Sequence, residues 1–533
     1  MTSNKEQPLD VAIIGAGAAG LSAARALLAD DQKIQSVHLL EANSYVGGRI
    51  FSNDDFVQGN RIDLGAEFIH GWETMLTDVV ESNKERWDKA VVDDATLPLL
   101  EEIFIASHAD GGPGEHPTKD GKYGVYYLSK EDKLLRYDTK DEDFRRMGDA
   151  LSSLVHMETC GAAQGVEDAE GEASCDATDP KSSGIDTSKS LADYLDESSA
   201  IAPRMLGLLD AGYGNTAACT DLSKISLNSH IDFEKYWEAN EEEGDFRLHP
   251  RIGMMGVVEA LRKEIEADGR CKIILNWKVE TVDWGKGNEK VIIVSSSGKR
   301  IAVDKVIATA PAPVITSETI LQFQPPLPQW KMKALKMVGM ERAIKIIVKF
   351  DQRVWPKDVQ TAICDEGPHS SVPEIWFREM TESMDGEAKQ IYLAVGFLTS
   401  RAADTLLENI GEMSQQETYM SVPLEQRRIN AAADIVKDQL ATIFAGSTSR
   451  DKVEEACVSA IMYDWGEIET IQGGYMYPKV GITRQHFLDL ARPIEQSLFF
   501  AGEATNTGAC CTVQAAMETG LRAANQILSN INS

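Results

Sequence analysis

The sequence predicts an α/β fold that begins with a Rossmann-like unit. The run DVAIIGAGAAGLSAARALL, residues 10–28, is typical of a buried strand, a glycine-rich turn and a helix with apolar residues at helical spacing. A second apolar stretch, IQSVHLLEAN, follows it and predicts the next strand of a βαβ unit. Because the chain has 533 residues, we expect at least one further domain beside this unit.

The turn after the first strand carries the GxGxxG spacing of dinucleotide-binding proteins. Gly15 permits the tight turn, Gly17 with Ala18 lets a pyrophosphate approach the backbone, and Gly20 lets the helix pack closely on the strand. The helix N-terminus then favours the phosphate charge. Glu41 lies 21 residues after Gly20, where a carboxylate accepts hydrogen bonds from a ribose and disfavours NADP. The alternative is a purely structural glycine turn.

Later segments alternate between strands and helices. Residues 271–284 and 289–311 are expected to form successive strands of a β-meander. Apolar runs at 340–350 and 390–398 predict longer strands, and 512–531 predicts an amphipathic C-terminal helix.

Charge and composition exclude several classes of function. The net charge of −31, from 84 acids against 53 bases, argues against nucleic-acid binding, because phosphates would be repelled. No apolar run is long enough to span a membrane, and the polar first ten residues lack a signal-peptide core, so a cytoplasmic protein is expected. The eight cysteines form no CxxC pair, so no metal site is predicted. The acidic stretch at 165–186 predicts a flexible insertion, placed at 160–190.

The residues that follow Glu41 carry a resemblance to a known family. ANSYVGGRIFS contains a second glycine pair, with Gly48, next to Arg49, and resembles the flavoprotein extension of the fingerprint. From there most of the chain resembles the flavin-dependent amine oxidases, a family that includes monoamine, polyamine and L-amino-acid oxidases and the lysine-specific histone demethylases. It is most similar to the polyamine oxidases of the spermine and acetylpolyamine type. The resemblance implies FAD as cofactor, contacted by Gly48, Arg49 and Val279.

Two motifs place candidate catalytic residues. DLGAEFIHG, residues 63–71, is similar to a polyamine oxidase segment whose active-site histidine falls on His70; a satisfied structural histidine is the alternative. GMERAIKIIVKF, residues 339–350, resembles the strand that carries the lysine beside flavin N5, and Lys345 falls on it. In the family this lysine binds a water that is hydrogen-bonded to N5. The alternative is a solvent-facing lysine on an edge strand.

Two further motifs complete the predicted site. In DWGEIETIQGGYMYPKVG the resemblance implies that Trp465 packs near the flavin and that Tyr475 forms an aromatic wall for the amine. Monoamine oxidases carry a flavin-linked cysteine where Gly474 stands here, so non-covalent FAD is predicted.

In LFFAGEATNTGACCTVQAAMETG the resemblance implies that Glu503 and Val513 contact FAD, and that Thr512 replaces a second cage tyrosine. Cys510 and Cys511 depart from the family pattern and are read as small buried residues, with a redox role as the alternative.

The resemblance also implies a domain plan: an FAD-binding domain with a discontinuous α+β substrate domain, the amine oxidase fold. The FAD domain is predicted at 1–80, 250–335 and 456–533, and the substrate domain at 81–249 and 336–455.

The activity that the resemblance implies is oxidation of an amine, with a polyamine as the leading substrate, by hydride transfer to flavin N5. The resulting imine is hydrolysed to an aldehyde and an amine, and O2 is reduced to hydrogen peroxide.

Three alternatives stay open. A monoamine is one, and an L-amino acid is another; the latter needs a buried arginine, whereas Arg342 lies three residues before Lys345 and so on the opposite face of the strand. The third is a flavin-dependent desaturase or isomerase on the same fold. A chromatin role like that of the histone demethylases is disfavoured, because the insertion has no heptad pattern.

Overall fold

The computed structural model describes most of the chain. The described residues are 9–30, 33–92, 97–104, 117–152, 188–197, 201–240, 244–285, 290–367, 370–384 and 387–530. The insertion predicted at 160–190 lies almost wholly outside these ranges.

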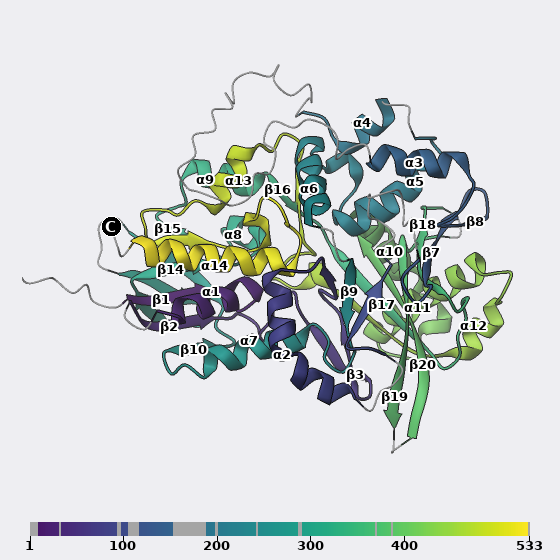
Figure 1. The fold of residues 1–533 in the computed structure, drawn as a ribbon, viewed down its shortest axis with the longest axis horizontal. Helices are drawn as coiled ribbons and strands as arrows, with labels where there is room; N and C mark the ends of the chain where they lie inside the picture. Colours follow the sequence, from purple (N-terminus) through teal and green to yellow (C-terminus); the bar gives the residue numbers. More distant parts are fainter. Residues whose placement is uncertain are drawn as a thin grey trace, which may run out of the picture.

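A five-stranded parallel sheet, in the order β10-β2-β1-β14-β23, forms one half of the molecule and carries the predicted nucleotide-binding turn. The predicted strand–turn–helix–strand unit is present as β1, α1 and β2, so the α/β class is confirmed. Helix α14 packs along α1 on one face of this sheet, with α7 and α2 beside them (Figure 1). The bounds of these elements are β1 Leu9–Ile14, α1 Ala18–Leu28, β2 Ile34–Leu40, α2 Met75–Val91, α7 Met255–Glu266, β10 Cys271–Ile274, β14 Lys305–Ala308, β23 Leu498–Phe500 and α14 Val513–Asn530.

The predicted meander is only partly correct. Three of its strands form an antiparallel sheet in the order β13-β12-β11, which β15 extends. The first and last strands of the region, β10 and β14, instead join the parallel sheet, because apolar residues cover both faces there. The antiparallel strands are β11 Val279–Asp283, β12 Val291–Ser295 and β13 Arg300–Val303, and β15 Gln322–Gln324 pairs with β11 in parallel.

A seven-stranded sheet, in the order β21-β17-β20-β19-β18-β7-β8, dominates the other half. Helices α10, α11 and α12 lie on its side of the molecule, and α10 and α11 contact β17 (Figure 1). Strand β17 is an interior strand and every residue in it is buried, so the solvent-facing alternative for Lys345 is wrong. The bounds are β7 Tyr123–Leu128, β8 Lys133–Arg136, β17 Ala343–Phe350, β18 Val359–Cys364, β19 Glu374–Met384, β20 Glu387–Thr399, α10 Ser400–Met413, α11 Leu424–Ile443, α12 Arg450–Ala456 and β21 Cys457–Asp464.

Small sheets join the two halves. The sheet β5-β9-β6 pairs His70 directly with Asp245 and Phe68 with Arg247. These strands are β5 Phe68–His70, β6 Leu100–Ile103 and β9 Asp245–Leu248, beside the pairs β3 Ser52–Val57 with β4 Asn60–Asp63 and β16 Val338–Met340 with β22 Met476–Pro478. The remaining helices are α3 Glu142–Ser152, α4 Leu191–Glu197, α5 Leu206–Leu209, a π-helix at Asp210–Ala217, α6 Leu227–Asn240, α8 Ala312–Thr316, α9 Gln329–Lys336 and α13 Arg484–Ala491, with 3₁₀ turns at Leu222–Lys224, Glu417–Tyr419, Trp465–Glu467 and Glu503–Thr505.

Sheet pairing bears on the predicted domain boundary near residue 456. The predicted FAD-domain segment 456–533 includes β21, yet this strand pairs with β17 in the seven-stranded sheet. The division into two domains otherwise stays a prediction. Within the described ranges, no helix combines the length and apolar character that crossing a bilayer requires.

Candidate active site

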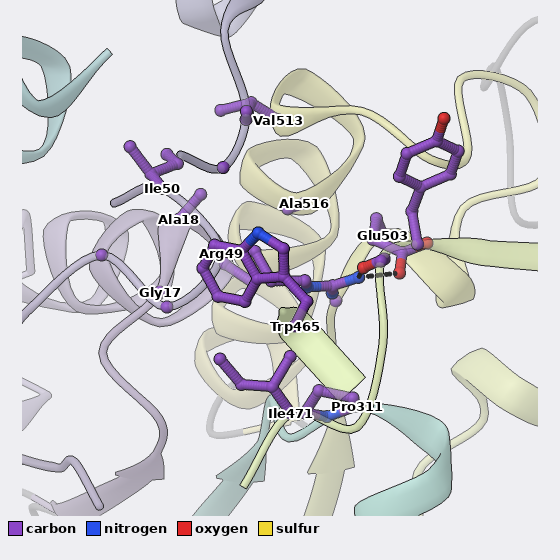
Figure 2. A pocket seen from close by; sticks show the side chains of 18 of the residues that line it. Gly17, Ala18, Arg49, Ile50, Pro311, Trp465, Ile471, Glu503, Val513 and Ala516 are labelled. Carbon is purple, nitrogen blue, oxygen red and sulfur yellow. Dashed lines mark hydrogen bonds and ion pairs between the residues drawn. The ribbon is translucent and has the colours of Figure 1, made fainter. Parts of the chain in front are cut away.

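One large cavity runs between the two halves of the molecule. Its lining begins at the turn after β1, passes the ends of β2 and α14, and reaches β17 and the neighbouring strands of the seven-stranded sheet. Figure 2 shows Arg49 extending toward Glu503, with Trp465 and Val513 among the side chains around them. Of the predicted site residues, the structure brings together Gly15, Gly17, Ala18, Glu41, Gly48, Arg49, His70, Val279, Lys345, Trp465, Tyr475, Glu503, Thr512 and Val513 in this lining.

At one end, the glycine turn forms a cradle with free backbone donors. Gly15 has φ +106°, which favours glycine, and helix α1 begins at Ala18 after Gly17 without a side-chain cap. The first N–H groups of the helix therefore stay available to a phosphate. Gly20 does not line the cavity; a Cβ there would lie 2.1 Å from the carbonyl oxygen of Gly15, so this glycine serves close packing.

Glu41 lies beside the cradle, at the end of β2. Its Oε2 accepts from the Ala16 N–H at 2.8 Å, and its Oε1 accepts from the backbone and side chain of Asn43 at 2.8 and 2.9 Å. Burial raises the pKa of this carboxyl despite those hydrogen bonds. The side chain is thus fixed in place at the cavity wall, as a ribose-binding acid requires.

Arg49 and Glu503 form a partly buried ion pair farther along the cavity. Arg49 Nη1 donates to Glu503 Oε1 at 2.7 Å and to the Gly474 carbonyl at 2.8 Å (Figure 2). Glu503 Oε2 is buried and accepts no hydrogen bond within the part of the chain that the structure describes. A buried carboxylate oxygen without a donor is costly, so this atom points to a donor that the described residues do not supply.

Lys345 enters the cavity from β17 with its ammonium held by the protein. Nζ donates to the Asp63 and Gly65 carbonyls at 3.0 and 2.9 Å and to Glu67 Oε2 at 2.9 Å. The resemblance implied a water as the partner of this lysine, and here a carboxylate and two carbonyl groups occupy its donors.

Glu67 is the centre of a buried charge cluster that the sequence did not reveal. Its Oε1 lies 2.8 Å from Arg247 Nε and 3.2 Å from Arg378 Nη1, and all three side chains are at most 4 % exposed. Burial alone would raise the pKa of Glu67, but the charges of Lys345, Arg247 and Arg378 outweigh it and lower the pKa to about 2. Burial and the nearby charge of Glu67 raise the pKa of Asp63 to about 6.

Aromatic side chains line the end of the cavity beyond Lys345. The rings of Trp376 and Phe397 stack with their centroids 5.5 Å apart, and Phe68 meets Trp376 edge-on at 4.8 Å. The Tyr475 hydroxyl donates to the Thr216 carbonyl, which fixes that ring at the wall. Together these rings form an apolar box that attracts and orients an amine.

The Glu374 carboxylate supports this aromatic box through two hydrogen bonds. It accepts hydrogen bonds from Trp376 Nε1 at 2.8 Å and from the Thr216 hydroxyl. The two wall residues Trp376 and Tyr475 are therefore linked through Thr216 and one buried carboxylate.

The remaining predicted residues, His70 and Thr512, also reach the cavity. His70 Nδ1 lies 2.7 Å from Asp245 Oδ1, its cross-strand neighbour, so the imidazole is held in one orientation. Thr512 accepts from the Ala515 N–H at 3.2 Å at the start of α14. Thr512 stands where the motif predicts a small residue, and the tyrosines that line the cavity in the described part of the chain are Tyr213 and Tyr475.

The comparison with protein families decides to which family the chain belongs. The family described as "Flavin containing amine oxidoreductase" matches residues 18–528, which is nearly the whole chain. The chain belongs to this family. It is therefore a flavin-containing enzyme of the amine oxidase type, as predicted.

Curated relatives of this amine oxidase include two kinds of protein. The chain is 26 % identical over 549 residues to lysine-specific histone demethylase 1 homolog 3 of Arabidopsis thaliana, covering 98 % of this chain and 30 % of that protein. It is 23 % identical over 511 residues to probable polyamine oxidase 4 of the same plant, covering 94 % and 83 %. The chain therefore spans less than a third of the first relative and most of the second.

Solved structures confirm the amine oxidase fold. Putrescine oxidase bound to putrescine matches 98 % of this chain and 99 % of its own, with a TM-score of 0.67 and 18 % identity. Cyclohexylamine oxidase from Brevibacterium oxydans matches 99 % and 100 %, with a TM-score of 0.66 and 18 % identity.

The residues present fit FAD. The uncapped start of α1 suits a pyrophosphate, Glu41 suits a ribose, and the buried Glu503 Oε2 lacks the donor that a bound group would supply. A side chain at Gly474 would meet Cys219 Sγ at 2.7 Å, so this position cannot carry a flavin-linked cysteine without rearrangement. The geometry agrees with non-covalent binding.

Several residues of the site were not found from sequence. Glu374, Trp376 and Arg378 alternate along β19 and so share one face of it, a period-2 signal that was available. Glu67 and Arg247 carry no comparable signal, because their partners come from distant segments. Arg342, the arginine that was considered, pairs with Asp464 instead of lining the cavity.

Cys511 lines the cavity and its thiol donates to the Met476 carbonyl at 2.9 Å. The hydrogen bond with Cys510, and then burial, raise its pKa well above the usual value, which favours the protonated thiol. Within the described part of the chain, no cluster of three His, Cys, Asp or Glu side chains is arranged to hold a metal ion.

Proposed function

We propose that this enzyme oxidises a polyamine, with the reacting nitrogen held between Lys345 and the aromatic box. One observation carries the proposal: a single cavity connects the nucleotide cradle at Gly17 with the box of Tyr475, Trp376 and Phe397. Curated relatives named as polyamine oxidases support the choice of substrate class.

The residues of the box bind and orient the amine. The faces of Tyr475, Trp376 and Phe397 attract the substrate nitrogen and exclude water around the carbon beside it. When bound, FAD accepts the two electrons and the hydrogen that leave this carbon. The Lys345 ammonium contributes a positive charge at the cavity wall where negative charge develops.

His70 is proposed to meet a second nitrogen of the substrate. The imidazole lines the cavity, and Asp245 fixes it through Nδ1. A distal nitrogen that hydrogen-bonds to this ring would place the reacting carbon at a set distance along the cavity, which is how a site selects among polyamines of different spacing.

A monoamine with an apolar substituent is the second candidate. Among the described residues, the acids that line the cavity are Glu41, Glu67 and Glu503, and each already holds hydrogen-bond or ion-pair partners. A polyamine carries charges that such acids would normally neutralise, whereas a single amine on an apolar group needs only the aromatic box.

An anaerobic titration of the purified, FAD-containing protein tests the proposal. Spermine, spermidine, putrescine, benzylamine, cyclohexylamine, a panel of L-amino acids and a methyl-lysine peptide are added separately while the flavin absorbance is recorded. Bleaching by a polyamine supports the leading proposal, and bleaching by cyclohexylamine or benzylamine alone moves it to the second candidate. If the flavin is retained but no amine bleaches it, the proposed function is wrong.

A further inference from the structure

The π-helix Asp210–Ala217 forms part of the cavity wall beside the aromatic box. Several of its residues, Thr216 among them, line the cavity. The helix contacts β18, β19 and β20 of the seven-stranded sheet, and two of these strands carry the box residues Trp376 and Phe397. Because π-helical turns are rare and are frequently found at functional sites, this one is a candidate for an element that shapes the box.

Thr216 is linked by hydrogen bonds to two rings of the box. Its carbonyl oxygen accepts from the Tyr475 hydroxyl. Its own hydroxyl donates to Glu374, a fully buried carboxylate that also accepts from Trp376 Nε1 at 2.8 Å. The backbone and the side chain of one residue therefore restrain a tyrosine beside β22 and a tryptophan on β19.

Asn215, the preceding residue, restrains a third ring through the main chain of β20. Its side-chain amide donates to the Phe397 carbonyl at 3.3 Å, and its Oδ1 accepts from the Thr399 N–H at 2.7 Å. The Thr399 hydroxyl donates to the same Oδ1 at 3.0 Å. The asparagine is 5 % exposed, so these bonds form away from water and fix the end of β20 against the π-helix.

We propose that Asn215 and Thr216 are positioning residues, through which the π-helix sets the spacing of Tyr475, Trp376 and Phe397 around the amine. The three rings come from segments far apart in the sequence, and these two consecutive residues are linked to all of them. Ring faces attract a cation strongly only when they lie close around it, so loss of either set of bonds weakens its binding. This inference rests on the proposed function, because it assumes that the amine binds in the box.

Asn60 supplies a matched control for Asn215. It is 4 % exposed, and its side-chain amide donates at 2.8 Å to the Thr381 carbonyl on β19, in the same sheet as β20. Neither Asn60 nor Thr381 lines the cavity in the part of the chain that the structure describes. Asn60→Leu and Asn215→Leu therefore remove the same kind of bond from a buried asparagine to a strand, but at different distances from the box.

Binding of tetramethylammonium to the FAD-containing protein measures the box without any oxidation. This ion offers a cationic surface to the rings, but its nitrogen has no lone pair, so it is not turned over. Titration calorimetry gives its dissociation constant in the wild type, Thr216→Val, Thr216→Ser, Asn215→Leu and Asn60→Leu. In NMR spectra of the same nitrogen-labelled proteins, the Trp376 indole N–H resonance, identified by its loss in Trp376→Phe, reports the bond to Glu374.

The proposal predicts that Thr216→Val and Asn215→Leu each weaken tetramethylammonium binding by about fivefold or more. Thr216→Ser keeps the hydroxyl that donates to Glu374, so its affinity stays within about twofold of the wild type, as does that of Asn60→Leu. The Trp376 indole resonance shifts in Thr216→Val and keeps its wild-type position in Thr216→Ser and Asn60→Leu.

Wild-type affinity in Thr216→Val or in Asn215→Leu would overturn the proposal. Equal losses in Asn215→Leu and Asn60→Leu would also overturn it, since they would indicate a general effect on packing, and so would a wild type that does not bind the ion. If Thr216→Val does not retain FAD, Thr216→Cys is measured in its place, because a thiol is of similar size and only a weak donor.

Failure of the proposed function gives a different result. In that case no amine bleaches the flavin, while tetramethylammonium still binds to the wild type and the variants still differ as stated.

Discussion

Lys345 and Lys349 lie four residues apart on one face of β17, and each is buried in an ion pair with a glutamate. Lys345 Nζ is 2.9 Å from Glu67, and Lys349 Nζ is 3.1 Å from Glu382. Each also donates to backbone carbonyl groups, two for Lys345 and one, that of Phe56, for Lys349. The ion pairs and hydrogen bonds of the two lysines are therefore of the same kind.

Their surroundings differ in two ways. Lys345 and Glu67 line the cavity, and Lys349 and Glu382 are absent from the lining that the structure describes. Glu67 also serves two buried arginines, whereas Glu382 pairs with Lys349 and accepts from the Gln58 N–H at 3.2 Å. A buried lysine in a strand is therefore no indication of function by itself; the cavity and the shared carboxylate distinguish the two.

The largest expected effect separates the two lysines by activity. Lys345→Met slows reduction of the flavin by the substrate at least ~100-fold, because a preorganised charge at the reacting centre is lost. Lys349→Met leaves that rate within about twofold, since Lys349 lies outside the cavity lining. Rapid mixing of each FAD-containing variant with the substrate under anaerobic conditions measures both rates. Equal rates for the two variants would remove the distinction.

Glu67 and Glu382 are expected to differ in how much they contribute to the free energy of unfolding. The pKa of Glu67 is lowered to about 2, so its contribution to folding is complete above about pH 4.5 and is lost as pH falls toward 2. Glu67→Gln is thus expected to lower the free energy of unfolding by about 3 kcal/mol at neutral pH, with the deficit vanishing near pH 2. Urea unfolding across this range measures it. The deficit of Glu382→Gln is smaller, because Glu382 serves one cation; a larger one would contradict the comparison.

Asp63 gives the free energy of unfolding a pH dependence opposite in sign to that of Glu67. Burial and Glu67 raise its pKa to about 6 in the folded protein, so the folded state keeps a proton that the unfolded state releases. As pH rises from about 4 to about 6, the wild type is expected to lose about 3 kcal/mol of stability through this group. Asp63→Asn removes that slope in urea unfolding. Identical slopes for the variant and the wild type would show that Asp63 does not titrate as proposed.

The aromatic neighbours give the smallest effect. Lys345 lies over the ring of Trp376 at 5.6 Å, and Lys349 lies over Phe56 at 5.4 Å. Trp376→Phe is expected to raise KM about fivefold with little change in kcat, because a better cation-binding ring leaves the amine box. Phe56→Leu leaves KM unchanged, since Phe56 does not line the cavity within the described chain. Steady-state kinetics of both variants decide whether the box binds the amine.

Local patterns in the sequence predicted the nucleotide-binding end well. The strand, turn and helix from β1 to α1 follow from near neighbours: apolar runs, Gly15 in the turn and Gly20 at the helix–strand contact. Helix α14, Val513–Asn530, matches the predicted range of 512–531 almost residue for residue, because its apolar periodicity is uninterrupted. Motif similarity then placed Lys345, Tyr475 and His70 in one cavity.

Long-range pairing was not accessible in the same way. β10 and β14 were expected to continue a meander and instead join a parallel sheet, because a strand's partner is set by the whole core. The cluster around Glu67 joins residues up to 311 positions apart, since Arg378 comes from β19. No spacing rule connects such residues, so the site's charge balance emerged only from the fold.

A crystal structure of the purified protein with FAD and its substrate amine, kept anaerobic, tests the central claim most directly. The account predicts density for the dinucleotide from the Gly17 cradle past Glu41, with the flavin ring beside Lys345 and the amine against Tyr475 and Trp376. A flavin bound elsewhere, or an amine away from the aromatic box, would contradict it.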